Sequence, residues 1–262
     1  MRHDSFLAEM KETADNEVLF IRSPQHVSSG AQSAKDEVAP VDLQDWMLSK
    51  PPEEPAPPTD LPESVWVGPE GHEGAAVLAE FLDGKVDVET GKKPSARAIC
   101  MVAPLGRDAT MTALDLGIEA ERTVAVDTLF GLEGRRTLMT TSVTDEGVRD
   151  LAHAVLTADD IPVTFIHDSP GFIAQRVIAT IVNISAEIAQ MRIATPEDIN
   201  KAVKLGLAYP QGPLEFGDTL CPAKIHAILT AMHDFYGDPR YRPSPWLTRR
   251  ARLGVSLMTP EA

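Results

Sequence analysis

The stretch DSPGFIAQR at residues 168–176 decides the fold, because it opens a long apolar helix after a region of alternating strands and helices. Pro170 and Gly171 predict a rigid entry turn, since proline fixes its own φ. Apolar residues then recur at three- and four-residue spacing, which predicts one apolar helix face made of Ile173, Val177, Ile181, Ile184 and Ile188. Three more residues broaden that face and predict burial against more than one element: Ile178, Val182 and Ala189.

Two further helices are predicted after this one. Thr195 is suited to cap the first of them, with Pro196 at its first position and Gly206 after its end. The next begins at Pro222 and ends at Gly237. Residues 168–262 are therefore predicted to form an all-helical domain.

Upstream, residues 61–167 alternate short apolar runs with helical segments. The predicted strands are VWVG, KVDVE, ARAICMVA, RTVAVDTLF, RTLMTT and IPVTFIH. The predicted helices are GAAVLAEFL, DATMTALDLG, which ends at Gly117, and VTDEGVRDLAHAVLTA, which Thr144 would cap. This alternation predicts a parallel or mixed sheet covered by helices, so the expected fold class is α/β followed by all-α.

Residues 1–60 differ from the rest in composition. Acidic residues outnumber basic ones there, and KPPEEPAPPTDLPE adds a proline cluster. Such a segment buries too little apolar surface to offset its ordering entropy, which predicts a mostly disordered arm or linker. Two short apolar patches, Val18–Ile21 and Leu43–Leu48, are suited to dock on a partner or, as we favour, on the chain itself.

The overall charge excludes some classes of function. A net charge of −15 over 262 residues argues against binding to nucleic acid or an anionic membrane. No apolar stretch is long enough for a membrane helix or a signal peptide, which predicts a soluble cytoplasmic protein. Cys100 and Cys221 lack the spacing of a zinc site, so we expect two buried, reduced thiols and no metal.

The segment VWVGPEGHEG has the outline of a dinucleotide-binding turn, a strand and glycines before a helix. Its glycines, Gly68, Gly71 and Gly74, follow G-x-x-G-x-x-G rather than G-x-G-x-x-G. Pro69 also removes one backbone donor from the turn. Only residues 90–95 separate the second strand from the third, too few for a helical crossover. We therefore predict an inactive remnant, with no cofactor bound by this chain alone.

Several motifs together resemble a known family. DSPGFIxxR, the PEDIN turn, KLGLAYPQGP and the FGD that follows resemble the carboxy-terminal domain of 3-hydroxyacyl-CoA dehydrogenases through residues 168–218. The ending DPRYRPSPWLTRRARLGVSL resembles the close of long bacterial members, which carry two such helical domains in tandem. The chain is similar to their second half. The resemblance implies a shortened, degenerate Rossmann-like segment followed by a helical domain for dimerisation and substrate.

The family resemblance also implies a chemistry, the NAD-linked oxidation of 3-hydroxyacyl-CoA thioesters in fatty or aromatic acid breakdown. A histidine paired with a glutamate serves as acid and base, and a serine and an asparagine hold the substrate. Position by position, this chain has Gly106 for the serine, Asp127 for the histidine, Met139 for the glutamate and Gln175 for the asparagine. No catalytic residue of the family therefore remains.

Some residues are still suited to a substrate. Arginine forks bind the phosphates of coenzyme A well, although arginines more often pair with the protein's own carboxylates. The substrate-binding candidates are Gln175, Arg176, Asp127, Arg249 and Arg250.

Three interpretations follow. In the first, the chain is the non-catalytic half of such a dehydrogenase, and an apolar face within residues 172–191 binds a catalytic half or another copy of the chain. In the second, it is a stand-alone module that binds acyl-CoA or acts as a scaffold. In the third, it is a dehydrogenase that uses Asp127 and an unrecognised cofactor site, which the four replaced positions argue against. We favour the first.

Overall fold

A computed structural model of the chain describes residue 58 and residues 60–261. The arm predicted at residues 1–60 therefore lies almost wholly outside the described residues. Pro57–Ala262 form one compact unit. The boundary predicted between residues 167 and 168 falls between the last strand of the sheet and the first helix of the helical region, and as a domain boundary it stays a prediction.

The sheet is mixed, as expected, with the strand order β2-β1-β3-β4-β5-β6. All neighbours are parallel except β4 and β5, which are antiparallel. Residues 90–98 connect β2 to β3 across β1 without a helix, as the short connection predicted. The bounds are β1 (Ser64–Gly68), β2 (Asp87–Glu89), β3 (Ile99–Val102), β4 (Thr123–Val126), β5 (Arg136–Thr140) and β6 (Val163–Ile166).

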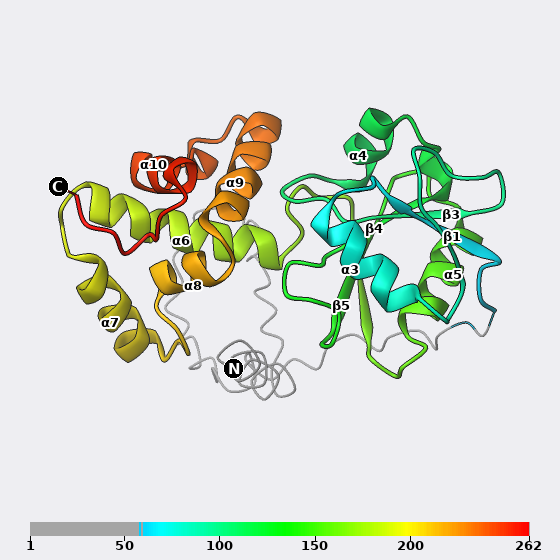
Figure 1. The fold of residues 1–262 in the computed structure, drawn as a ribbon, viewed down its shortest axis with the longest axis horizontal. Helices are drawn as coiled ribbons and strands as arrows, with labels where there is room; N and C mark the ends of the chain where they lie inside the picture. Colours follow the sequence, from blue (N-terminus) through cyan, green and yellow to red (C-terminus); the bar gives the residue numbers. More distant parts are fainter. Residues whose placement is uncertain (1–57, 59, 262) are drawn as a thin grey trace, which may run out of the picture. The chain divides into compact units, whose positions relative to one another are not determined.

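Helices cover both faces of this sheet (Figure 1). On one face, buried residues of α3 (Glu73–Leu82) and α5 (Glu146–Leu156) join Val65, Met101 and Val124 in one core. On the other face, α4 (Ala109–Leu116) packs against residues that include Trp66, Cys100 and Phe172. Because alternate strand residues point to opposite faces, a run such as ICMV contributes to both cores.

Two helix ends predicted from the sequence, the end of α4 and the start of α5, compare differently with the structure. Gly117 ends α4 in the left-handed conformation, as predicted. The predicted cap of α5 is wrong, because the side chain of Asp145, not of Thr144, accepts from the helix, at Gly147 N. The Thr144 hydroxyl instead donates to Thr123 O and accepts from Thr141 N. Either residue type can cap a helix, and the neighbouring strand ends provide Thr144 with better placed partners.

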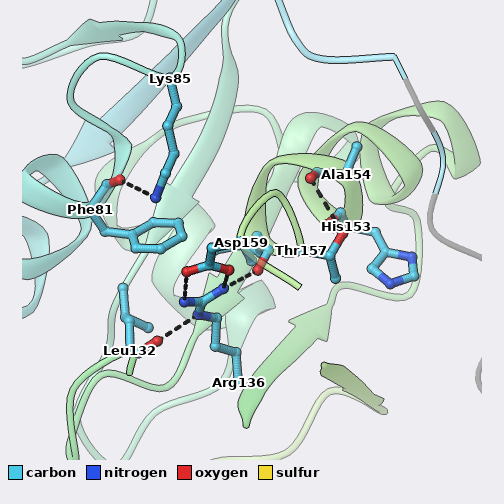
Figure 2. A network of polar contacts seen from close by, with 9 residues as sticks. Phe81, Lys85, Leu132, Arg136, His153, Ala154, Thr157 and Asp159 are labelled. Carbon is cyan, nitrogen blue, oxygen red and sulfur yellow. Dashed lines mark hydrogen bonds and ion pairs between the residues drawn. The ribbon is translucent and has the colours of Figure 1, made fainter. Parts of the chain in front are cut away.

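A buried arginine connects β5 to the ends of α3 and α5 (Figure 2). The Arg136 guanidinium donates to both carboxylate oxygens of Asp159 at 2.6 Å, and to the carbonyls of Leu132 and Leu156. It also lies over the Phe81 ring, 4.3 Å from the centroid. The Asp159 carboxylate and the two carbonyls thereby compensate the buried positive charge of Arg136, as a buried cation requires.

In the helical region, α6 packs against α8, α9 and α10 (Figure 1), while α7 contacts α6 and α8. The helices lie at α6 (Ala174–Gln190), α7 (Pro196–Leu207), α8 (Pro213–Thr219), α9 (Pro222–Tyr236) and α10 (Pro245–Leu253). Thr195 caps α7 and Gly237 ends α9, as predicted. Gly206 was predicted to follow α7 but lies inside it, since the helix continues to Leu207 and Ala208 takes the left-handed conformation.

The apolar character of α6 divides between two sides. Ile178, Val182 and Ala189 are buried, as expected. The prediction that the other apolar positions are buried with them is wrong within the chain, because Ile173, Val177, Ile184 and the following Met191 are more than half exposed. Ile181 and Ile188 lie between them and are partly exposed. We call these six residues the outer face of α6: Ile173, Val177, Ile181, Ile184, Ile188 and Met191.

The two cysteines differ in burial. Both thiols are free, and Cys100 is buried, where desolvation raises its pKa to about 11. Cys221 was expected to be buried but is exposed, because it precedes the first turn of α9 on the surface. Within the described part of the chain, no helix has the length and apolar character needed to cross a bilayer.

Candidate functional site

Gln175, in the first turn of α6, connects three segments that lie far apart in the sequence. Its Oε1 accepts a 2.7 Å hydrogen bond from Gly106 N, in the loop after β3. Its Nε2 donates to Pro104 O at 3.1 Å and to Asp127 Oδ1, just after β4, at 2.9 Å. Only 1% of Gln175 is exposed, so this amide serves as an internal bridge between the sheet and α6.

Asp127 is placed by the end of β4, where its backbone N–H donates to Thr137 O at 3.0 Å. Its Oδ1 accepts from both Gln175 and Leu129 N. Burial raises the pKa of Asp127, and these two hydrogen bonds oppose the effect without cancelling it. What distinguishes Asp127 from a free acid or base is that its Oδ1 is already engaged by two groups of the chain itself.

Gly106 has no room for a side chain. Its φ is +70°, and a Cβ built on it would collide with the backbone of Ile228 in α9, 2.7 Å from the Cα. A serine here would need both a strained backbone and a displaced helix. The loop after β3 is therefore packed directly against α9 in this chain.

Met139 completes the set of positions selected from the sequence. It is fully buried in β5, within the core that contains Phe172, and its sulfur lies 2.9 Å from Ser169 N. The structure thus brings Gly106, Asp127 and Gln175 into one hydrogen-bonded group, with Met139 in the adjacent core. None of these contacts leaves a poised acid and base pair.

The glycine turn after β1 does not fit a dinucleotide. Pro69 offers no N–H, and Glu73 places a carboxylate in the first turn of α3, where a pyrophosphate would need positive potential. Glu73 Oε1 lies 2.6 Å from Lys224 Nζ, so the chain itself supplies both charges at this helix end. Gly74 keeps one role of the expected motif, because a Cβ there would meet Ala103 and Thr128.

Asp87 and Glu89 follow the glycine turn by about twenty residues, where a dinucleotide-binding fold places the acidic residue that holds a ribose. The carboxylate of Glu89, at the end of β2, accepts from the hydroxyls of Ser64 and Ser95 and from Ser95 N, at 2.7 to 2.9 Å. The hydrogen bond from Ser95 N is the main cause of a lowered pKa at Glu89. Among the described residues, no group of three His, Cys, Asp or Glu side chains is placed to hold a metal ion.

Arg176 lies beside Gln175 but faces a different surface. One guanidinium nitrogen, Nη2, donates to Ser169 Oγ, Pro170 O and Tyr236 Oη at 2.7 to 2.8 Å. Its buried Nε has no partner among the described residues. Arg176 also lines an open hollow of about 390 Å³, together with Ile166, His167, Ser169, Phe172, Ile173 and Val177.

The two remaining candidates, Arg249 and Arg250, lie on α10, at the opposite end of α6. Arg249 Nη1 is 3.5 Å from the side chain of Gln190, which is about 22 Å along the helix from Gln175. Arg250 is buried, stacks on Trp246 at 3.2 Å from the ring centroid, and donates to Thr259 O. Its guanidinium is committed to holding the carboxy-terminal segment.

The motif residues that carry the family resemblance mainly hold the fold, and sequence reasoning missed these roles. Asp168 accepts from Ala109 N at 2.7 Å and Thr110 N at 3.1 Å, and so adds to the cap that Asp108 makes at the start of α4. Asn200 Oδ1 accepts from Leu214 N at the start of α8. Asp218 Oδ1 accepts from Leu257 N at 2.7 Å. Motifs of this kind therefore indicate an architecture rather than a reaction.

Comparison with known proteins finds a match for the helical region. Residues 171–257 match the family model described as 3-hydroxyacyl-CoA dehydrogenase, C-terminal domain. The helical region of the chain is thus similar to the carboxy-terminal domain of this dehydrogenase family. The family model covers the helices from α6 to α10 but not the sheet, so the match concerns the helical region alone.

The curated proteins that the chain resembles are distant in sequence. The chain is similar to the 3-hydroxyadipyl-CoA dehydrogenase of Escherichia coli, with 29% identity over 178 residues, 68% of this chain and 36% of that protein. It is 31% identical over 114 residues to the 3-hydroxybutyryl-CoA dehydrogenase of Clostridioides difficile, 44% of this chain and 39% of the relative. The chain thus spans little more than a third of the length of these curated relatives.

Solved structures of two dehydrogenases agree with the fold. The 3-hydroxybutyryl-CoA dehydrogenase of Escherichia coli gives a TM-score of 0.53 at 30% identity, covering 58% of this chain and 31% of that one. The (S)-3-hydroxybutyryl-CoA dehydrogenase of Ralstonia eutropha gives a TM-score of 0.59, covering 76% of this chain and 71% of that one. Its identity of 16% makes the second a likeness of fold alone.

Proposed function

We propose that this chain is the non-catalytic half of a 3-hydroxyacyl-CoA dehydrogenase, similar to the second half of the long tandem form, and that it binds a catalytic half through the outer face of α6. The observation that carries the proposal is the bridge made by Gln175. Its amide joins Gly106 to Asp127, two positions where the family's serine and histidine would stand. The former reaction site is therefore used for internal contacts.

Two further contacts support a non-catalytic role. The Glu73–Lys224 ion pair occupies the helix end where a cofactor's phosphates would lie. Close packing of Gly106 on α9 leaves no room for the substrate serine. Restoring one catalytic side chain would not restore turnover, because the cofactor site and the substrate site are both altered.

The outer face of α6 supports a partner role. Ile173, Val177 and Ile184 expose 54%, 52% and 57% of their surface, which is unusual for isoleucine and valine aligned on one helix. From Val177 to Met191 the apolar positions alternate steps of four and three residues. That spacing suits a partner helix lying along α6.

The first experiment follows NADH oxidation by the purified full chain with acetoacetyl-CoA, beside a complete dehydrogenase of the family as positive control. We expect no turnover. Turnover that is abolished by Asp127→Ala would refute the proposal, because it would show that a new active site has replaced the family's own.

The second experiment measures binding of the chain to a complete 3-hydroxyacyl-CoA dehydrogenase from the same genome, by sedimentation velocity. Burying Ile184 contributes about 2 kcal/mol, so Ile184→Asp is expected to weaken association at least thirtyfold. Leu114→Asp is the matched control, because Leu114 is 60% exposed on α4, far from this face in the sequence. Equal effects of both variants would exclude the outer face as the binding surface.

A second candidate function is binding of acyl-CoA without catalysis, which the hollow beside Arg176 favours. Apolar Ile173 and Val177 line it together with His167 and the Arg176 guanidinium. An anionic group with an apolar tail suits such a lining. Calorimetric titration with acetoacetyl-CoA tests it, with Arg176→Met as the variant expected to lose binding. Heat that is the same for both proteins would dismiss this candidate.

A further inference from the structure

Two opposite charges flank the outer face of α6. Arg176 and Glu187 are eleven residues apart in the sequence. Because each residue of an α-helix turns about 100° and rises about 1.5 Å, the two lie about 20° apart around the axis and about 16 Å apart along it. Both therefore border the same side of the apolar stripe, with the positive charge near its amino end and the negative charge near its carboxyl end.

Neither charge forms an ion pair with any residue that the structure describes. Both side chains are nevertheless partly buried, where a charge is seldom left unpaired. Carboxylates are abundant in a chain of net charge −15, and several other arginines lie beside one: Arg107, Arg122, Arg136 and Arg250. The two charges that border the outer face are thus free to pair with groups from another molecule.

The guanidinium of Arg176 is held in a fixed position. Its Nη2 donates to Ser169 Oγ, Pro170 O and Tyr236 Oη at 2.7 to 2.8 Å, and its Cζ lies 5.3 Å from the centroid of the Tyr236 ring. These hydrogen bonds all involve Nη2, and the buried Nε has no partner among the described residues. A guanidinium that is already ordered loses little conformational freedom when it pairs with a carboxylate.

The hollow of about 390 Å³ beside Arg176 is continuous with the outer face, because Ile173 and Val177 belong to both. Of the seven residues that line this hollow, Arg176 alone is an Arg, Lys, Asp or Glu. One negative group on a short aliphatic stem matches this lining, and that is the chemistry of an aspartate or glutamate side chain. An open hollow at the edge of an apolar face is also the kind of place where a partner protein inserts an anchoring side chain.

We propose that the helix of the catalytic half that lies on the outer face carries an Asp or Glu side chain that enters the hollow and pairs with Arg176, and a Lys or Arg side chain that pairs with Glu187. This partner chemistry rests on the function proposed above and adds the means by which the partner is selected. Charges that border a contact between two helices set its register and exclude wrong partners. A helix with the two charges exchanged would place like charges together at both ends and would be rejected.

The first test measures association of the full chain with a complete 3-hydroxyacyl-CoA dehydrogenase from the same genome, by sedimentation velocity. We expect Arg176→Glu and Glu187→Lys each to weaken association about tenfold, because each puts two like charges in place of an ion pair. Arg149→Glu and Glu146→Lys are the matched controls, since they make the same changes of charge at exposed positions of α5. Raising the salt from about 50 mM to about 500 mM should reduce the difference between variants and controls below about threefold.

The second test identifies the acidic side chain of the partner and does not depend on reversing a charge. Arg176→Lys keeps the positive charge and provides a primary amine, which a water-soluble carbodiimide joins to a carboxylate in direct contact as an amide, taking up the water that is lost. We expect mass spectrometry to find position 176 joined to one Asp or Glu of the dehydrogenase. Changing that acidic residue to lysine should then restore the association that Arg176→Glu loses.

The outcomes separate this pairing from the proposed function. Association that Ile184→Asp abolishes but that both charge variants leave at the level of their controls would keep the proposed function and overturn the pairing. A cross-link from position 176 only to carboxylates of the chain itself would also overturn it. Absence of association at either salt concentration would refute the proposed function and the pairing together.

A second copy of the chain is the competing occupant, since Arg176 of one copy could meet Glu187 of another in an antiparallel pair of α6 helices. Sedimentation of the chain alone tests this. Dimers that Arg176→Glu abolishes, and that Arg176→Glu combined with Glu187→Arg restores, would show that the chain satisfies its own charges and would overturn the choice of partner. A chain that stays monomeric at the concentrations where it binds the dehydrogenase supports the proposal.

Discussion

Replacing Gln175 with alanine is expected to destabilise the protein by about 3 kcal/mol. The side chain makes three hydrogen bonds, from Gly106 N and to Pro104 O and Asp127, each worth about 1 kcal/mol net. Gly106 and Pro104 are buried, so their backbone groups would find no replacement partner in water. For a folded unit of about 200 residues this predicts a fall in Tm of roughly 9 °C.

Gln190→Ala is the matched control for this prediction. It makes the same chemical change at the other end of α6. There the side chain is only partly buried, and its Oε1 accepts a long hydrogen bond of 3.5 Å from the exposed Arg249. Urea unfolding followed by far-UV circular dichroism gives both free energies of unfolding. If the two variants differ by less than about 0.5 kcal/mol, the bridge between sheet and α6 contributes little, and the argument for a reaction site converted to internal contacts fails.

Three other substitutions test the physical account. Burial raises the pKa of Asp127, so the stabilising contribution of this carboxyl is lost as pH rises through that pKa. Asp127→Asn removes the titrating group. In urea melts, the variant should therefore gain stability relative to the native chain from pH 4 to pH 7. Arg136→Met should lower the free energy of unfolding by about 3 kcal/mol at pH 7 and by less below pH 3.8. The reason is that Arg136 lowers the pKa of Asp159, and the stability linked to that shift is lost as pH falls. A difference between variant and native chain that stays constant with pH would contradict this. Gly217→Ala should destabilise the protein by about 2 kcal/mol in thermal melts, since a Cβ would lie 2.8 Å from Val182 Cγ1. Gly206→Ala has open space around it and should instead stabilise the protein by about 0.5 kcal/mol.

The family motifs are informative because they describe contacts rather than chemistry. Asp168 caps α4, Gly171 has φ +82° and lies against Met232, and Phe172 fills the core beneath the sheet. A chain can keep all of these and lose its acid, its base and its cofactor turn. Resemblance in such motifs therefore supports the fold more strongly than the reaction.

Local signals determined much of this protein from sequence alone. The alternation of apolar runs located the strands of the mixed sheet, because a buried strand needs continuous apolar residues on both faces. Thr195 and Gly237 were correctly predicted to bound their helices, since capping depends on neighbours within one turn. The replacement of four family positions was also predicted from the sequence, as departures from a pattern of fixed spacing, and it stays a prediction.

Tertiary structure decided what those departures mean. That Gln175 would join Gly106 to Asp127 depends on two segments that precede it by 48 to 71 residues meeting at its side chain, which no local pattern encodes. Which apolar side of α6 is buried was equally hidden, because both sides carry isoleucine or valine and only packing against α8, α9 and α10 selects one. Asp145 rather than Thr144 caps α5 for the same reason, since the carbonyl of Thr123, 21 residues away in the sequence, accepts a hydrogen bond from the Thr144 hydroxyl. Periodicity and capping act over a few residues and can be read from the chain, whereas burial and long-range hydrogen bonding depend on which segments the fold brings together.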